Sequence, residues 1–66
     1  MTKKHFEALA KALAELYSKA ENVDQRLAID KAEIAVRNVC GNFCKNFDRD
    51  KFRERFWFLV EYFEAE

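Results

Sequence analysis

The chain has no proline, one glycine (Gly41), one histidine (His5) and one serine (Ser18) among its 66 residues. The scarcity of proline and glycine excludes collagen-like repeats, proline-rich linkers and most turn-rich β architectures. A single glycine cannot form a glycine-rich phosphate-binding loop. The longest wholly apolar run is the five residues 56–60, whereas a membrane-spanning helix needs about 20. We therefore expect no membrane span, and the charged N-terminal segment predicts no secretory signal.

An excess of charge of one sign is also missing, because 12 basic residues balance 12 acidic ones. Half of the residues are hydrophobic, which excludes a disordered charged tail. A chain near 60 residues forms one domain at most and buries only about 60% of the surface that its unfolded form exposes. Such chains often depend on disulfides, a metal or a partner subunit. We predict one helical domain over residues 1–66, either closed by its aromatic side chains or completed by homodimerisation.

Three amphipathic segments predict an all-α, compact three-helix fold, because apolar residues recur at steps of three and four. The predicted helices cover residues 3–20, 23–43 and 49–64. Their predicted N-caps are Thr2, Asn22 and Asp48, since short polar side chains accept hydrogen bonds from the first free backbone N–H groups. The connections are short, so successive helices should pack antiparallel.

The same periodicity predicts which side of each helix faces the core. The first helix should bury Phe6, Leu9, Ala10, Leu13, Leu16, Tyr17 and Ala20. The second should bury Ala28, Ala32, Ala35, Val36, Val39, Cys40 and Phe43, with the alanines allowing close packing. The third should bury Phe52, Phe56, Leu59, Val60 and Phe63. Phe47, which precedes the Asp48 cap, should pack near Phe52 as a hydrophobic staple.

Nothing in the sequence indicates catalysis. General acid–base chemistry needs groups held in a pocket, but the carboxylates are dispersed and His5 is expected in solvent at the N-terminal turn. Cys40 and Cys44 form a C-x-x-x-C pattern with too few further ligands for a zinc site in one chain. A site shared by two chains is the alternative to two reduced, buried thiols. We expect no enzyme, no catalytic residue, no metal and no cofactor.

Apolar residues beyond the predicted core stripes form the strongest indication of function. They are Trp57, Phe58 and Tyr62 of the third helix and Val23, Leu27 and Ile34 of the second. Large aromatic side chains are common at binding hot spots, and surplus apolar patches indicate a partner or self-association. These six residues are therefore the predicted partner-binding residues. Irregular packing that buries them all in one core is the alternative.

Nucleic-acid binding is a second, less favoured hypothesis. Five basic residues lie within eleven positions, interleaved with Phe47 and Phe52 and followed by Phe56: Lys45, Arg49, Lys51, Arg53 and Arg55. Such a mixture can bind phosphates and stack bases. Acidic residues lie in the same stretch, however, and the chain is neutral, whereas small DNA-binding domains are usually basic. Acidic residues at the end of the third helix disfavour an anionic membrane surface, so no membrane partner is expected.

Two segments carry a resemblance to known proteins. Residues 1–10 (Met-Thr-Lys-Lys-His-Phe-Glu-Ala-Leu-Ala), and residues 39–40 followed by residues 46–52 (Asn-Phe-Asp-Arg-Asp-Lys-Phe), resemble the corresponding segments of a group of small phage and prophage accessory proteins. This chain has Cys44 and Lys45 where that group tends to have Asn-Pro, and it continues into an aromatic helix where members of the group often stop.

The group has no assigned activity, so the resemblance transfers no functional residue. It implies a phage accessory protein in the bacterial host cytoplasm. We therefore expect a non-enzymatic protein-interaction module that modulates or inhibits a bacterial host protein. A nucleic-acid-binding accessory protein and a homo-oligomeric structural protein are the alternatives.

Overall fold

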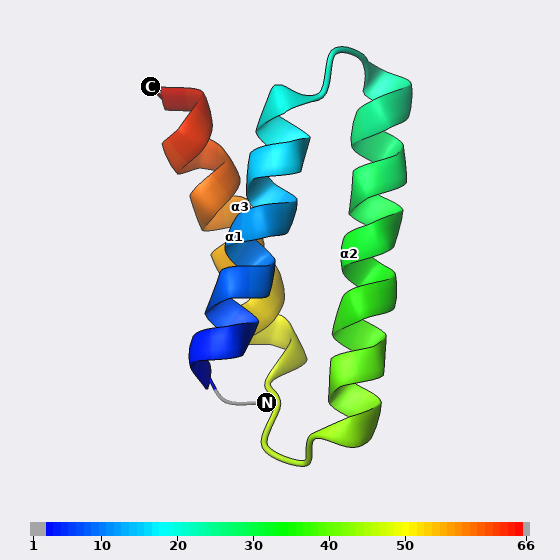
Figure 1. Ribbon diagram of the computed structural model, residues 1–66, viewed down its shortest axis with the longest axis vertical. Helices are drawn as coiled ribbons and strands as arrows, with labels where there is room; N and C mark the ends of the chain where they lie inside the picture. The colour runs from blue at the N-terminus through cyan, green and yellow to red at the C-terminus, as the bar shows by residue number, and fades with distance from the viewer. Residues whose placement is uncertain (1–2, 66) are drawn as a thin grey trace.

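The computed structural model describes residues 3–65 and shows an all-α, three-helix protein (Figure 1). The helices are α1 (Lys3–Lys19), α2 (Val23–Phe43) and α3 (Arg49–Ala65). The predicted helix bounds are confirmed to within one residue at each end. The proposed cap Thr2 lies outside the described residues.

Two predicted N-caps are confirmed by their hydrogen bonds. The backbone N–H of Gln25 donates to Oδ1 of Asn22 over 2.9 Å, and the N–H of Lys51 donates to Oδ1 of Asp48 over 3.0 Å. Each bond satisfies one of the backbone donors that a helix start leaves free. The capping side chains therefore fix where α2 and α3 begin.

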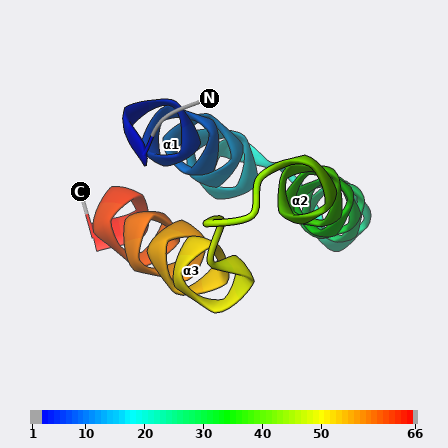
Figure 2. The same ribbon diagram turned by 90° about the horizontal axis from the view of Figure 1, so that it is seen from below.

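The three helices stand at the corners of a triangle when the bundle is seen end-on (Figure 2). α1 and α3 run in the same direction and α2 runs back between their ends (Figure 1), so successive helices are antiparallel, as predicted. α1 packs more extensively against α3 than α2 packs against either helix. The bundle is thus an α1–α3 pair with α2 attached to its side.

The core lies mainly between α1 and α3. Its fully or almost fully buried apolar side chains are Ala10 and Ala14 of α1, Cys40 of α2, and Phe52, Phe56 and Val60 of α3. The small alanines of α1 leave room for the phenylalanines of α3. Half-buried Tyr17 and Trp57 close this core, with ring centroids 5.1 Å apart in an edge-to-face arrangement. The inward stripe predicted for α3 is confirmed, since Leu59 and Phe63 also pack against the core.

The predicted staple is present at the lower end of the bundle. The rings of Phe47 and Phe52 are 5.4 Å apart, and Phe6 of α1 lies 4.7 Å from Phe47. Phe47 therefore joins the connection between α2 and α3 to the first turns of α1 and α3. This contact positions the loop that contains Cys44 and Lys45.

The inward stripe predicted for α2 is confirmed only for Val36 and Cys40 and is wrong for its other members. Most of its members are exposed, namely Ala28, Ala32, Ala35, Val39 and Phe43, and 85% of Phe43 is accessible to solvent. The inward side instead carries Arg26, Ile29, Asp30, Glu33, Val36, Arg37 and Cys40, all buried or half-buried. The physical reason is that the inward charges pair with α3. Leu16 of α1, also predicted inside, is exposed as well.

Candidate functional site

A cluster of charged side chains joins α2 to α3. The side chain of Glu33 is completely inaccessible to solvent. Its Oε1 accepts a hydrogen bond from Nη1 of Arg53, and its Oε2 lies 3.1 Å from Nε of Arg37. Nη1 of Arg53 is also 2.7 Å from Oδ1 of Asp30. Two arginines thus compensate the buried carboxylate, as a buried charge requires.

The position of Arg53 is set by rings as well as by charges. Its guanidinium carbon lies 5.1 Å from the centre of the Trp57 ring and 5.8 Å from that of Phe56, within the range of cation–π attraction. Desolvation by burial lowers the pKa of Arg53, but hydrogen bonds to Glu33 and Asp30, and the charges of both, outweigh it. The pKa of Arg53 therefore lies above its ordinary value and the side chain stays cationic.

A further arginine, Arg26, connects the first turn of α2 to the other two helices. Nη2 of Arg26 lies 3.1 Å from Oε1 of Glu64 in α3, and its guanidinium carbon is 5.2 Å from the centre of the Tyr17 ring in α1. Both partners of this ion pair are well exposed, so the pair contributes little to stability. The attachment of α2 nevertheless depends on charged side chains at several points along its inward side.

The outward side of α2 carries large apolar side chains, because charged residues occupy much of its inward side. Five large ones are exposed, from 36% for Ile34 to 85% for Phe43. We call this set the α2 outer surface, and it comprises Val23, Leu27, Ile34, Val39 and Phe43. At about 100° per residue, the first three lie on one flank of the helix and the last two on the other. The exposed alanines Ala28 and Ala35 lie between the two flanks.

The six predicted partner-binding residues do not form one surface. Val23, Leu27 and Ile34 are exposed on the α2 outer surface. Phe58 and Tyr62 are exposed on α3, by 57% and 53%, and the guanidinium of Arg55 lies over the Phe58 ring at 5.4 Å. Trp57 instead packs against the core beside Tyr17 and Phe56. The structure thus gives two separate exposed patches and one core residue.

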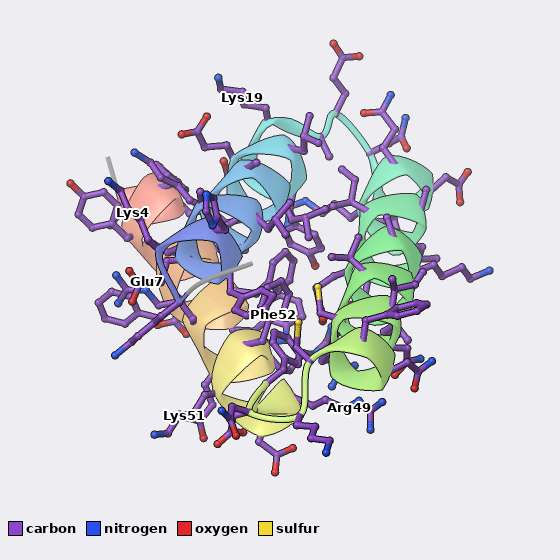
Figure 3. The ribbon with its side chains drawn as sticks, turned by 60° about the horizontal axis from the view of Figure 1, so that its bottom comes forward. Lys4, Glu7, Lys19, Arg49, Lys51 and Phe52 are labelled. Carbon is purple, nitrogen blue, oxygen red and sulfur yellow. The ribbon has the colours of Figure 1, made fainter. Side chains whose placement is uncertain are left out.

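The five basic residues of the nucleic-acid hypothesis are also divided. Lys45, Lys51 and Arg55 line one hollow at the lower end of the bundle. Arg53 belongs to the buried charge cluster, and Nη2 of Arg49 donates a hydrogen bond to Oδ1 of Asn42 over 3.1 Å. In Figure 3, Lys51 extends outward from the start of α3 and Arg49 lies toward the end of α2. The structure therefore brings three of the five residues together.

Several residues of these surfaces were not predicted from the sequence to be functional, and three of them, Phe6, Val39 and Phe43, were predicted to lie in the core. The full set is Asp30, Glu33 and Arg37 of the charge cluster, Val39 and Phe43 of the α2 outer surface, and Lys3, Phe6 and Glu7 of the hollow. One signal could have revealed the cluster: charges of both signs occur at positions 26, 30, 33 and 37, which share one side of a helix. No comparable pattern marks the hollow, because its lining comes from three separate segments.

The two cysteines are free: Cys40 is buried and Cys44 is half-buried at the hollow. Burial raises the pKa of the Cys40 thiol, and the neighbouring Cys44 raises it further. Within residues 3–65, no three His, Cys, Asp or Glu side chains gather where they could hold a metal ion. None of the helices in this part of the chain combines the length and apolar character needed to cross a bilayer.

Comparisons of the chain with protein-family models, with curated proteins and with solved structures found no match.

Proposed function

We propose that this protein is a non-enzymatic protein-interaction module whose partner is a second copy of the same chain, bound through the α2 outer surface. One observation carries the proposal: α2 turns a buried glutamate inward and leaves five large apolar side chains in solvent. Large apolar side chains exposed in this number on one helix are typical of an interface. Pairing two copies would remove that surface from water without rearranging the charge cluster.

The exposed area of the whole molecule is large for its mass. A folded monomer of 7.9 kDa is expected to expose about 4,400 Å². This chain exposes 4982 Å², an excess of about 600 Å² over that scaling. A specific interface of standard size buries about 800 Å² on each partner. The whole molecule thus exposes more surface than its mass predicts, by an amount somewhat smaller than one half of a standard interface.

The charge and shape of the outward side favour a second copy. The charged residues between its two apolar flanks are one acid and one base, Asp24 and Lys31, so two copies meet without a net charge of one sign. Ala28 and Ala35 occupy the same strip and allow close approach of a facing helix. Because the large side chains shift from one flank to the other along α2, the two helices would cross obliquely.

A bacterial host protein is the alternative occupant of the same surface. It would follow from the resemblance to small phage accessory proteins, which implies the host cytoplasm as the location. The apolar patch at Phe58 and Tyr62 lies on α3, away from the α2 outer surface. A homodimer would therefore leave that patch free for a different partner.

Sedimentation equilibrium from low-micromolar to near-millimolar concentration tests the proposal. The wild-type protein should approach twice the mass of 7.9 kDa, and Leu27→Gln/Ile34→Gln should remain a monomer with unchanged helical circular dichroism. The matched control is Phe58→Gln/Tyr62→Gln, which changes equally exposed side chains of α3 and should still dimerise. A wild-type protein that is monomeric throughout would contradict self-association and leave a different protein as the occupant.

A further inference from the structure

A hollow lies at the lower end of the bundle, lined by the start of α1, the connection after α2 and the first turns of α3. Figures 1 and 2 show where these three segments lie. The volume of the hollow is about 870 Å³, within the range of about 300–1,000 Å³ found for small-molecule sites. It is an open depression, not a closed cavity. The α2 outer surface contributes none of its lining, so self-association and ligand binding can be tested separately.

The rim of the hollow is predominantly cationic. Four basic side chains line it, Lys3, Lys45, Lys51 and Arg55, against two acidic ones, Glu7 and Asp48. The carboxylate of Asp48 already accepts the backbone N–H of Lys51. Among residues 3–65, none of the four cations takes part in an ion pair. An anionic ligand would therefore displace no ion pair among these residues, and the guanidinium of Arg55 would keep or exchange its contact with the Phe58 ring.

The floor of the hollow is aromatic. Phe6, Phe47 and Phe52 line it in a continuous row, with centroid distances of 4.7 Å and 5.4 Å between neighbours. Phe52 is buried and points between the helices (Figure 3), whereas Phe6 and Phe47 are half-exposed. Phe6 and Phe47 are thus only partly covered by the protein, which leaves room for contact with a flat ligand. Cations around half-exposed rings are the combination that binds a phosphate and stacks a base.

We propose that this hollow binds one nucleoside monophosphate unit, either a free nucleotide or a nucleotide of a single strand. The phosphate would lie among Lys45, Lys51 and Arg55, and the base against Phe6 and Phe47. Lys51 and Arg55 are one helical turn apart, so their side chains reach the same side of α3. The zero net charge of the chain disfavours a duplex, whose binding depends on many phosphate contacts.

Amide chemical shifts in NMR spectra test the site directly, with thymidine monophosphate and tetrathymidylate as separate probes. At least one probe should shift amides around the hollow, at residues 3–10 and 44–55, and its affinity should fall as salt is raised. Lys45→Gln/Lys51→Gln should weaken binding about tenfold or more, as expected for losing charged hydrogen bonds. Binding of the monophosphate identifies the free nucleotide as sufficient, and binding of tetrathymidylate alone identifies a single strand.

The control variant is Lys11→Gln/Lys19→Gln, which removes two lysines of α1 that do not line this hollow. It should bind as the wild type does. Absence of shifts with both probes at millimolar concentration, or an equal loss in the control variant, would overturn the proposal. So would shifts of the same size with inorganic phosphate alone, because the aromatic floor would then have no role.

Cys44 supplies a second readout because its side chain lines the hollow. A saturating concentration of the probe that binds should slow alkylation of Cys44 by iodoacetamide in Cys40→Ala protein. An unchanged alkylation rate would place the nucleotide elsewhere and contradict the proposal.

Discussion

Arg53 of α3 donates a hydrogen bond to Glu33 of α2, a carboxylate that solvent does not reach. Buried ion pairs add little net stability compared with apolar packing, but they are costly to break and can fix one arrangement among several. A helix with apolar residues on several sides has no unique inward face from hydrophobic burial alone. We infer that Glu33 selects the side of α2 that faces the bundle and thereby leaves the α2 outer surface in solvent.

Replacing Glu33 by glutamine should destabilise the fold strongly. The change removes the buried charge and leaves Arg37 and Arg53 without their shared partner, which costs 3–5 kcal/mol in typical buried pairs. Both arginines are partly exposed and Asp30 remains beside Arg53. We therefore expect the free energy of unfolding to fall by about 2–3 kcal/mol, below or at the low end of that range. Urea denaturation followed by circular dichroism measures the loss.

Asp30→Asn is the matched control for that change. The Asp30 side chain is 27% exposed, and when its charge is removed, Glu33 still compensates the charge of Arg53. The substitution should cost less than about 1 kcal/mol, as partly exposed ion pairs do. Equal losses of unfolding free energy in the two variants would show that the burial of Glu33 does not increase its contribution to stability.

Phe56→Ala and Phe58→Ala compare a core ring with an exposed ring two residues away on the same helix. Phe56 is fully buried and Phe58 is 57% exposed. Phe56→Ala should cost about 3–5 kcal/mol through lost burial and a cavity, whereas Phe58→Ala should cost about 0.5 kcal/mol or less. Thermal and urea unfolding measure both, at a concentration where each variant has the same oligomeric state. A large loss for Phe58→Ala would place its ring in the core.

Gly41→Ala should stabilise α2. A Cβ at this position would lie 2.3 Å from Nε of Arg49, so the guanidinium must move and its hydrogen bond to Asn42 is lost. Arg49 is an exposed, flexible side chain, so this movement costs little. Alanine is favoured over an interior helical glycine by about 0.8–1 kcal/mol, and we expect a net gain of about 0.5 kcal/mol in urea unfolding. A net loss would show that the Arg49 contact outweighs helix propensity, and Arg49→Ala/Gly41→Ala would then recover the gain.

The Cys40 thiol should make stability depend on alkaline pH. Burial raises the pKa of this thiol above its ordinary value of 9.0, so the folded protein holds the proton more tightly than the unfolded chain does. The resulting contribution to stability is complete below the ordinary pKa and is lost as pH rises through the raised one. The stability of wild type relative to Cys40→Ala should therefore be constant up to about pH 8 and fall as pH rises above about 9 in urea unfolding. A constant difference between the two proteins would contradict this assignment.

The helix bounds and the buried side of α3 could be predicted, because residues close together in the sequence determine them. Asn22 and Asp48 mark helix starts through hydrogen bonds to residues three positions later. Phe52, Phe56 and Val60 repeat at four-residue steps, and the first turns of α3 are charged apart from Phe52, which indicates the side of α3 that is buried. These features depend on residues close together in the sequence.

The orientation of α2 could not be predicted in the same way. Its alanines and Val39 form a regular apolar row, yet the fully buried residue of α2 is Glu33, because Arg53 of another helix compensates its charge. That partner is 20 positions away in the sequence, and no local pattern links the two. The hollow was missed for a similar reason: Lys3 and Phe6 meet Lys45 and Phe47 only after the chain has folded.

The most direct test of the proposed dimer is an isotope-filtered NOE measurement on a sample that mixes labelled and unlabelled wild-type chains. The NOEs observed between chains should involve the methyl groups of Leu27, Ile34 and Val39, which belong to the α2 outer surface. NOEs between chains that arise only from the rings of Phe58 and Tyr62, or none at a concentration where the mass is that of a dimer, would contradict the account.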